Sequence, residues 1–284
     1  MRMIQSLILS TLGLLSLQAY AFDLTFVSAS EQVYAHPHDL VLSADRRYLY
    51  VADNGNDRIV VLDANTLKLV GTFGEDQLDE PHDVALLSGD QLFVADTGNS
   101  RIAIYKVSGK IGVLIGELRG AIRRPEGVAV TSNGRVYATG AASNNIELFE
   151  KGKSVAITAG LSSPHDVSIA ADGSLWIADA NNDRLVQMSQ DLKIKRILQG
   201  APYHFSGPRY LDFDSQGRLY VADKYNHQVK VLGTDLRLLT TVGTGKAGMG
   251  PGKFDRPEGI TIHGEDVWFS DTYNDRIVRY RIND

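Results

Sequence analysis

Residues 49–62 read LYVADNGNDRIVVL, and close variants of this stretch recur five times further along the chain. The variants are LFVADTGNSRIAIY (92–105), VYATGAASNNIELF (136–149), LWIADANNDRLVQM (175–188), LYVADKYNHQVKVL (219–232) and VWFSDTYNDRIVRY (267–280). Self-similarity at a spacing of roughly 20–50 residues is the sequence signature of repeat architectures. The repeat, rather than any single element, therefore determines the expected fold.

A proline opens each repeat shortly before this stretch. Six prolines occupy the position, at successive spacings of 44, 44, 39, 44 and 49 residues: Pro37, Pro81, Pro125, Pro164, Pro208 and Pro257. Each unit reads as four short strands, with no helical period of about 3.6 residues. Four strands in roughly 40–45 residues are typical of one propeller blade. The sequence predicts an all-β fold, a six-bladed β-propeller of four-stranded blades.

The two ends of the repeat array complement each other. The sixth repeat has room for only three strands before Asp284, while residues 23–30 (DLTFVSAS) form an extra strand ahead of the first repeat. A ring closed by the N-terminal strand completing the last blade removes both exposed strand edges. An open superhelical solenoid is the alternative, but such arrays normally carry polar caps.

The first 21 residues, MRMIQSLILSTLGLLSLQAYA, have the pattern of a secretory signal peptide. Arg2 precedes an apolar run over residues 4–17, and the small residues Ala19 and Ala21 lie just before the expected cleavage point. The alternative, a membrane anchor, needs an apolar stretch of about 20 residues. We expect cleavage after Ala21, a propeller over residues 22–284, and a secreted or periplasmic location with no membrane span in the processed chain.

Composition limits the expected partners. The chain has no cysteine, which excludes disulfides and thiolate chemistry. Removing residues 1–21, which contain one of the 29 basic and none of the 34 acidic residues, leaves 28 against 34 and a net charge of −6. This balance argues against nucleic acid as a partner. We expect a monomer that binds an envelope protein, a peptide or a glycan.

The residues shared by the repeats have a structural explanation. An aspartate recurs at Asp53, Asp96, Asp179, Asp223 and Asp271, with an asparagine three positions later and usually an arginine after that. Asp can accept backbone N–H groups in a tight turn, Asn tolerates left-handed geometry, and Arg could bridge to a neighbouring blade. In the third repeat Thr139 replaces the aspartate and no arginine follows, so that blade is expected to be distorted.

The position after the repeat proline differs from blade to blade. Around the ring it holds His38, His82, Glu126, His165, Arg209 and Glu258. If the first strand of each blade lines the channel, these side chains converge at one mouth. Two His and one carboxylate from alternate blades (His82, His165 and Glu258) form a known set for catalytic zinc or non-haem iron, with His38 and Glu126 as further ligands. The alternative is a mutually neutralising polar plug.

The Pro-x-Gly/Asp start and the V-A-D-x-x-N-x-R-I turn resemble the NHL-repeat family over residues 33–284. Within it the chain is most similar to the peptidyl-α-hydroxyglycine α-amidating lyases. That resemblance implies zinc held by three His that each follow a proline, as His82 and His165 do, and a tyrosine in an Asp-x-Tyr turn, as Tyr225 and Tyr273 are. The chain departs from this pattern in having Glu258 in place of the third His, and Lys224 where an Arg would follow the turn aspartate.

Two functions follow. The favoured one is a binding or scaffold protein of the cell envelope, with a divalent metal such as zinc at the channel mouth and no organic cofactor. The alternative is a metal-dependent lyase or hydrolase, in which Tyr225 or Tyr273 acts as base and Arg209 steadies an anionic group. Loop aromatics offer further candidate contacts, the alternative being packing between blades: Tyr203, Phe205, Tyr210 and Phe254.

Overall fold

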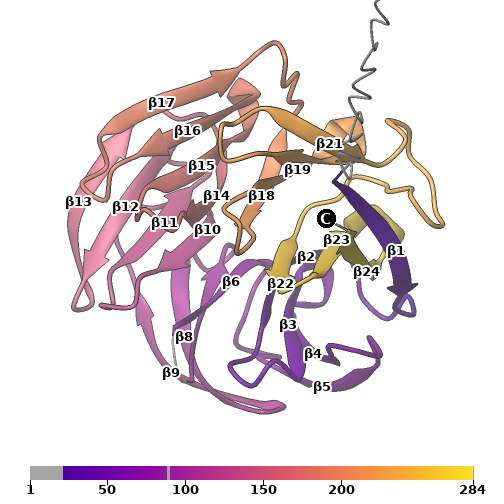
Figure 1. The fold of residues 1–284 in the computed structure, drawn as a ribbon. Helices are drawn as coiled ribbons and strands as arrows, with labels where there is room; N and C mark the ends of the chain where they lie inside the picture. The colour runs from indigo at the N-terminus through magenta and orange to yellow at the C-terminus, as the bar shows by residue number, and fades with distance from the viewer. Residues whose placement is uncertain (1–21, 88–89, 284) are drawn as a thin grey trace, which may run out of the picture.

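The computed structural model describes residues 22–87 and 90–283. They form six four-stranded antiparallel sheets arranged as blades around a central axis (Figure 1). This confirms the six-bladed β-propeller. The expected signal peptide, residues 1–21, lies outside the described residues.

The strands of the first three blades follow the repeats closely. Blade one contains β2 (Pro37–Leu42), β3 (Tyr48–Asp53), β4 (Arg58–Asp63) and β5 (Leu69–Phe73). Blade two contains β6 (Pro81–Leu87), β7 (Gln91–Asp96), β8 (Arg101–Ser108) and β9 (Ile111–Leu118). Blade three contains β10 (Pro125–Val130), β11 (Val136–Gly140), β12 (Asn145–Glu150) and β13 (Lys153–Ala159).

The remaining blades repeat the pattern. Blade four contains β14 (Pro164–Ile169), β15 (Leu175–Asp179), β16 (Arg184–Met188) and β17 (Ile194–Gln199). Blade five contains β18 (Pro208–Phe213), β19 (Leu219–Asp223), β20 (Gln228–Leu232) and β21 (Leu238–Val242). Blade six contains β22 (Ile260–His263), β23 (Asp266–Asp271), β24 (Arg276–Asn283) and the N-terminal β1 (Asp23–Ala29). Short 3-10 turns link second and third strands: η1 (Asn54–Asn56), η2 (Ala180–Asn182), η3 (Lys224–Asn226) and η4 (Thr272–Asn274).

The N-terminal strand closes the ring, as predicted. β1 pairs antiparallel with β24, from Asp23 opposite Asn283 to Ala29 opposite Val278 (Figure 1). The blade-six indole Trp268 Nε1–H also donates to the carbonyl of Ala64 in blade one at 3.0 Å. The N-terminal strand therefore completes the last blade, and a side-chain hydrogen bond joins that blade to the first.

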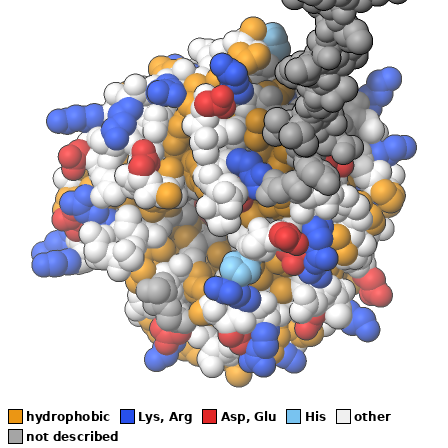
Figure 2. Space-filling model, in the orientation of Figure 1, with side chains coloured by type: hydrophobic (Ala, Val, Ile, Leu, Met, Phe, Trp, Pro, Cys, Tyr) orange, Lys and Arg blue, Asp and Glu red, His pale blue; other side chains and the backbone are white. Residues whose placement is uncertain are grey.

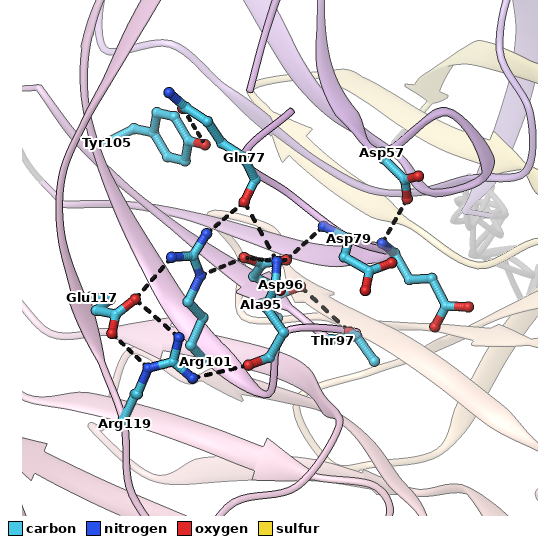
Figure 3. A network of polar contacts seen from close by, with 12 residues as sticks. Asp57, Gln77, Asp79, Ala95, Asp96, Thr97, Arg101, Tyr105, Glu117 and Arg119 are labelled. Atoms are coloured by element: carbon cyan, nitrogen blue, oxygen red, sulfur yellow. Dashed lines mark hydrogen bonds and ion pairs between the residues drawn. The ribbon is translucent and has the colours of Figure 1, made fainter. Parts of the chain in front are cut away.

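The recurring aspartate organises the turn of five of the six blades. In blade two the Asp96 carboxylate accepts the N–H of Asp79 at 2.8 Å and the Arg101 Nε–H at 2.6 Å, and Asn99 donates to it as well (Figure 3). The expected role of Asp is confirmed. The left-handed residue is not the Asn but the one after it, Ser100 in blade two (φ 48°), so that expectation for Asn is wrong. The arginine, however, pairs with the aspartate of its own blade rather than with a neighbouring blade, because the two residues lie opposite each other in adjacent strands.

Backbone donors connect each blade to the next. The N–H of the residue before each repeat proline donates to a turn residue of the preceding blade, as Glu80 does to Asp57 at 2.8 Å (Figure 3). The contact that joins blade six to blade one is His36 N–H to the Asp275 carboxylate, at 2.8 Å. The other four contacts are Arg124 to Ser100, Ser163 to Asn144, Gly207 to Asp183, and Arg256 to His227.

Blade three is regular, so the expectation that it is distorted is wrong. Gly140, not Thr139, occupies the aspartate position, because it lies opposite Asn145 as Asp96 lies opposite Arg101. The backbone donor equivalent to Asp79, the N–H of Arg123, donates to Ser143 Oγ at 2.9 Å. Glu147 of the next strand accepts the N–H groups of Ala121 and Ile122 at 2.9 and 3.0 Å. Other residues therefore satisfy the backbone donors that precede the proline of this blade.

The hydrophobic core is divided among the interfaces between blades. Within the described residues, six buried apolar clusters form, and each draws on two consecutive blades, including blades six and one. The surface carries basic and acidic side chains interspersed with hydrophobic ones (Figure 2). Across residues 22–87 and 90–283 no helix is long and apolar enough to cross a membrane.

Candidate functional site

The six variable side chains converge at one mouth of the channel. In blades one to five the first strand begins with a β-bulge directly after the repeat proline, as between Pro37 and Leu40 of blade one. A bulge leaves residues out of the strand ladder and re-aims their side chains. The position after the proline is thereby freed from the ladder, and all six side chains are buried: His38, His82, Glu126, His165, Arg209 and Glu258. We call these six residues the mouth ring.

Contacts within the mouth ring join neighbouring blades. Glu258 lies 3.2 Å from Nδ1 of His38 and 2.5 Å from Nζ of Lys224. Glu126 contacts Nδ1 of His165. These contacts favour the predicted polar plug as the description of most of the ring.

His82 makes a different set of contacts. Its Nδ1 lies 2.9 Å from the carbonyl oxygen of Glu80 and 3.1 Å from Nδ2 of Asn54. Its ring meets the ring of His38 edge-on, with 4.3 Å between the centroids. The structure therefore brings the predicted residues together, but in pairs from adjacent blades instead of a trio from alternate blades.

Burial and charge fix the ionisation of the ring. Burial lowers the pKa of His38 to about 3 and also lowers the pKa of His165, so both imidazoles are neutral at pH 7. Burial raises the pKa of Glu126, but its direct contact with His165 and the positive charge of Arg209 outweigh burial and lower the pKa to about 2. For Glu258 the opposing charges of Lys224 and Arg209, and its contact with His38, likewise outweigh burial and lower the pKa. Two glutamates are thus ionised beside two cations.

Unsatisfied polar atoms gather in the mouth ring. Ten buried side-chain nitrogen or oxygen atoms of the described residues have no hydrogen-bond partner, and seven of them belong to His38, Glu126, His165, Arg209 and Glu258. Five of the seven still lie in charge contacts. The other two, Nε and Nη1 of Arg209, have neither kind of contact. Most buried polar groups are hydrogen-bonded in native proteins, so such a cluster calls for an explanation.

The predicted catalytic tyrosines form the rim above the ring. Tyr225 of η3 is 53% exposed and Tyr273 of η4 is 41% exposed, and they are the only exposed aromatic residues among those described. The Arg209 Nη2–H donates to the Tyr225 hydroxyl at 3.3 Å, and the guanidinium lies 5.6 Å from the Tyr225 ring centroid. Arg256 lies 4.4 Å from the ring centroid of Tyr273.

The floor of the mouth was not predicted from the sequence. The Tyr210 side chain of blade five reaches across the channel, and its hydroxyl lies 3.2 Å from the carbonyl oxygens of His82 and Glu126 in blades two and three. Tyr210 was expected among the exposed loop aromatics, which is wrong, since a channel-lining strand carries it. Phe205 and Phe254 are also buried, as the alternative of packing between blades predicted.

The opposite end of the channel holds a separate cavity of about 220 Å³. Apolar side chains and four aspartates, Asp39, Asp83, Asp166 and Asp212, line it, and no member of the mouth ring does. Burial raises the pKa of Asp39, Asp83 and Asp166, in the case of Asp83 to about 6, and Asp39 is hydrogen-bonded to Asp83. Two carboxyl groups in such contact share a proton. The second position after the repeat proline also varies between blades, and this variation is the sequence feature that could have predicted the buried aspartates.

The shared proton gives a pH dependence that can be measured. The pKa of Asp83 rises from an ordinary 3.8 to about 6 on folding, so its contribution to stability is present below pH 3.8 and lost as pH rises through 6. We expect Asp83 to account for up to about 3 kcal/mol of the unfolding free energy that the wild-type protein loses between pH 4 and pH 8. In Asp83→Asn the loss measured by urea unfolding at the two pH values should be smaller by that amount, while the other aspartates of the cavity, whose pKa values burial also raises, still contribute. Asp45→Asn, at an exposed carboxylate with a lowered pKa, should follow the wild-type curve.

The zinc site implied by the family resemblance does not fit the observed arrangement. Among the described residues, no three His, Asp or Glu side chains are grouped so as to hold a metal ion. Glu258 already forms an ion pair with Lys224. Lys224 lies beside the ring because it follows the turn aspartate of blade five. Glu258 would have to leave this buried ion pair before it could bind zinc. The metal ligands predicted from the sequence stay a prediction.

Comparison with known proteins agrees with the repeat and the fold. The family model described as NHL repeat matches residues 78–105 and 205–232, in blades two and five. One curated relative, the protein SUPPRESSOR OF QUENCHING 1, chloroplastic, of Arabidopsis thaliana, is 23% identical over 295 residues, 89% of this chain and 25% of the relative. The chain therefore spans about a quarter of that protein's length.

Solved structures with this fold have varied functions. A virginiamycin B lyase from Staphylococcus aureus aligns at a TM-score of 0.67 and 15% identity, over 92% of this chain and 99% of its own. An auxiliary nutrient binding protein from Bacteroides thetaiotaomicron aligns at 0.71 and 16%, over 88% and 70%. Hydrazine synthase of Kuenenia stuttgartiensis aligns at 0.64 and 14%, over 88% and 96%. At these identities the likeness shows the fold alone.

The fold and the repeats together define the class of protein: a six-bladed antiparallel β-propeller with a polar channel mouth. Two of its six repeats, at residues 78–105 and 205–232, match the NHL-repeat model.

Proposed function

We propose that this protein is an exported ligand-binding propeller of the cell envelope, and that the ligand binds at the mouth ring. The observation that carries the proposal is the buried Arg209 guanidinium in the ring, whose Nε and Nη1 have neither a hydrogen-bond partner nor a charge contact. Such atoms lose hydrogen bonds to water on folding and regain them only from a ligand or an ordered water. A ligand that supplies the missing partners recovers the free energy that burial of these atoms costs.

The shape of the mouth supports binding over passage through the channel. Tyr210 bridges the channel below the ring, so a ligand enters from one side. The two exposed tyrosines stand at this entrance, and tyrosine offers both an apolar ring and a hydroxyl to a partner. A binding function has a structural precedent in the auxiliary nutrient binding protein, which shares the fold.

Export and an acidic net charge complete the proposal. The pattern of residues 1–21 supports a cleaved signal peptide, and the resulting net charge of −6 disfavours polyanions. A peptide, a glycan or a small metabolite remains compatible with the polar mouth.

A thermal-shift screen tests the proposal. Full-length protein exported with its own N-terminus is heated with a panel of carboxylates, amines, sugars, short peptides and zinc chloride, since ligand binding to the folded state raises the melting temperature. We expect at least one organic class to raise the melting temperature of the wild type. The double variant Tyr225→Ser/Tyr273→Ser should lose most of that rise while melting like the wild type without ligand.

A matched control separates the mouth from other exposed apolar positions. Ile111→Ser/Ile115→Ser changes two exposed residues of the outer strand β9 and should keep the full ligand-induced rise. An unchanged rise in the tyrosine double variant contradicts the proposed site.

The second candidate is a metal-dependent lyase or hydrolase, favoured by the convergence of three imidazoles and two carboxylates on one mouth. It requires the ring contacts of Glu258 and Glu126 to open. The zinc arm of the screen decides it: a rise with zinc that disappears in His82→Ala/His165→Ala supports this candidate over the organic ligand.

A further inference from the structure

Arg209 differs from every other buried cation of the described residues. Lys224, Lys230 and Arg276 are likewise buried, and each has a close acceptor: Glu258 at 2.5 Å, the Tyr203 carbonyl at 2.6 Å and Asp271 at 2.8 Å, respectively. Arg209 is 6% exposed, yet Nε and Nη1 have no partner, and Nη2 has only the Tyr225 hydroxyl at 3.3 Å.

Such an arginine is unfavourable in the unliganded protein. The guanidinium stays charged under all ordinary conditions, so burial cannot be relieved by losing a proton. A buried charged donor without an acceptor carries the full penalty of its lost hydration. Glu126 and Glu258 lie near enough for Arg209 to lower their pKa values, but their direct contacts are with His165 and Lys224, respectively. Among the described residues, no carboxylate forms an ion pair or a hydrogen bond with the Arg209 guanidinium.

We propose that Arg209 binds the carboxylate of a small organic monoanion whose body lies against Tyr225 at the rim. The inference rests on the proposed ligand-binding function and names the chemical class of the ligand. A carboxylate matches the planar donor fork of a guanidinium better than any neutral group. Tyr225 borders both the donors and the solvent, so it meets the part of the ligand next to the carboxylate.

The fixed charges of the mouth favour one negative charge over two. Arg209 and Lys224 are balanced by Glu126 and Glu258, while His38 and His165 are neutral at pH 7. A monoanion placed on Arg209 leaves a single excess charge, whereas a phosphate dianion adds repulsion from two buried carboxylates. We therefore expect carboxylates to bind and phosphates to be rejected.

Isothermal titration calorimetry at pH 7 tests the inference with three probes of similar shape. Phenylacetate has the carboxylate, phenylacetamide has a neutral group in its place, and phenyl phosphate has a dianion. We expect phenylacetate to bind at least tenfold more tightly than either of the others. Arg209→Met should weaken phenylacetate binding at least tenfold, and Arg124→Met, at an exposed arginine paired with Glu80, should leave it unchanged.

The melting temperature without ligand gives an independent readout. Arg209→Met removes unsatisfied donors, so the variant should melt at or above the wild-type temperature. If Arg209 serves only to neutralise the two glutamates of a closed plug, the variant should melt lower. A lower melting temperature of Arg209→Met, together with no phenylacetate binding by the wild type, overturns the inference. Equal binding of phenylacetate by wild type and Arg209→Met overturns it as well.

Failure of this inference can be told apart from failure of the proposed function. If no carboxylate binds but a neutral ligand raises the melting temperature in a Tyr225- and Tyr273-dependent way, the mouth is a binding site and the carboxylate assignment is wrong. If nothing binds at the mouth, both fail together.

Discussion

Glu258→Gln is expected to lower the free energy of unfolding by about 3–5 kcal/mol at pH 7. The Glu258 side chain is fully buried and contacts both Lys224 and His38. The substitution keeps the shape of the side chain but leaves the buried Lys224 ammonium without its counter-charge, which is the costly way to break a buried ion pair. Urea unfolding of variant and wild type under identical conditions measures the difference.

Glu80→Gln is the matched control for this prediction. Glu80 forms an ion pair with Arg124 at 2.6 Å, but both side chains are about half exposed. Exposed ion pairs contribute about 0–1 kcal/mol, so the control should stay within about 1 kcal/mol of the wild type. A loss for Glu258→Gln as small as that of Glu80→Gln contradicts the paired description of the mouth ring.

Leu24→Ala tests the closure of the ring by β1. The substitution is expected to destabilise the protein by about 2–5 kcal/mol, because it removes a buried apolar side chain. Leu24 is 7% exposed and belongs to the apolar cluster between blades five and six. Its removal leaves a cavity where the N-terminal strand meets the last blade. Thermal and urea unfolding of the processed protein give the magnitude.

Val27→Ala, in the same strand, separates packing from strand propensity. Val27 is 44% exposed, so its truncation should change the stability by less than about 0.5 kcal/mol. Equal effects of the two substitutions would show that β1 does not pack into blade six. Deletion of residues 23–29 exposes the β24 edge and should cause aggregation, as free strand edges promote association.

The fold was predictable because the repeat specifies it locally six times. The Pro opening and the Asp and Asn of the turn act within one blade. The N-terminal strand pairs with the far end of the chain, and it was predictable because the last repeat has only three strands of its own. Blade three was misjudged because the aligned residue was shifted by one, and because Ser143 of the turn accepts the backbone N–H that the aspartate accepts in other blades. A substitution that moves the acceptor to another residue leaves no mark at the repeat position itself.

The candidate site was predictable in its location but not in its pairing. The variable position after each proline identified all six members of the mouth ring, because every blade places that position at the channel. Which carboxylate meets which cation depends on rotamers and on distances across blades, and Lys224 enters from a turn. The isolation of Arg209 is visible only once the other acceptors have been assigned to their partners.

A crystal structure of the protein grown with phenylacetate is the sharpest test of carboxylate binding at the mouth ring. We expect the carboxylate to lie within hydrogen-bond distance of Arg209 and the phenyl ring to lie beside Tyr225, above Tyr210. Phenylacetate bound instead in the aspartate-lined cavity at the other end of the channel, or an Arg209 hydrated only by water at saturating phenylacetate, would contradict this binding mode.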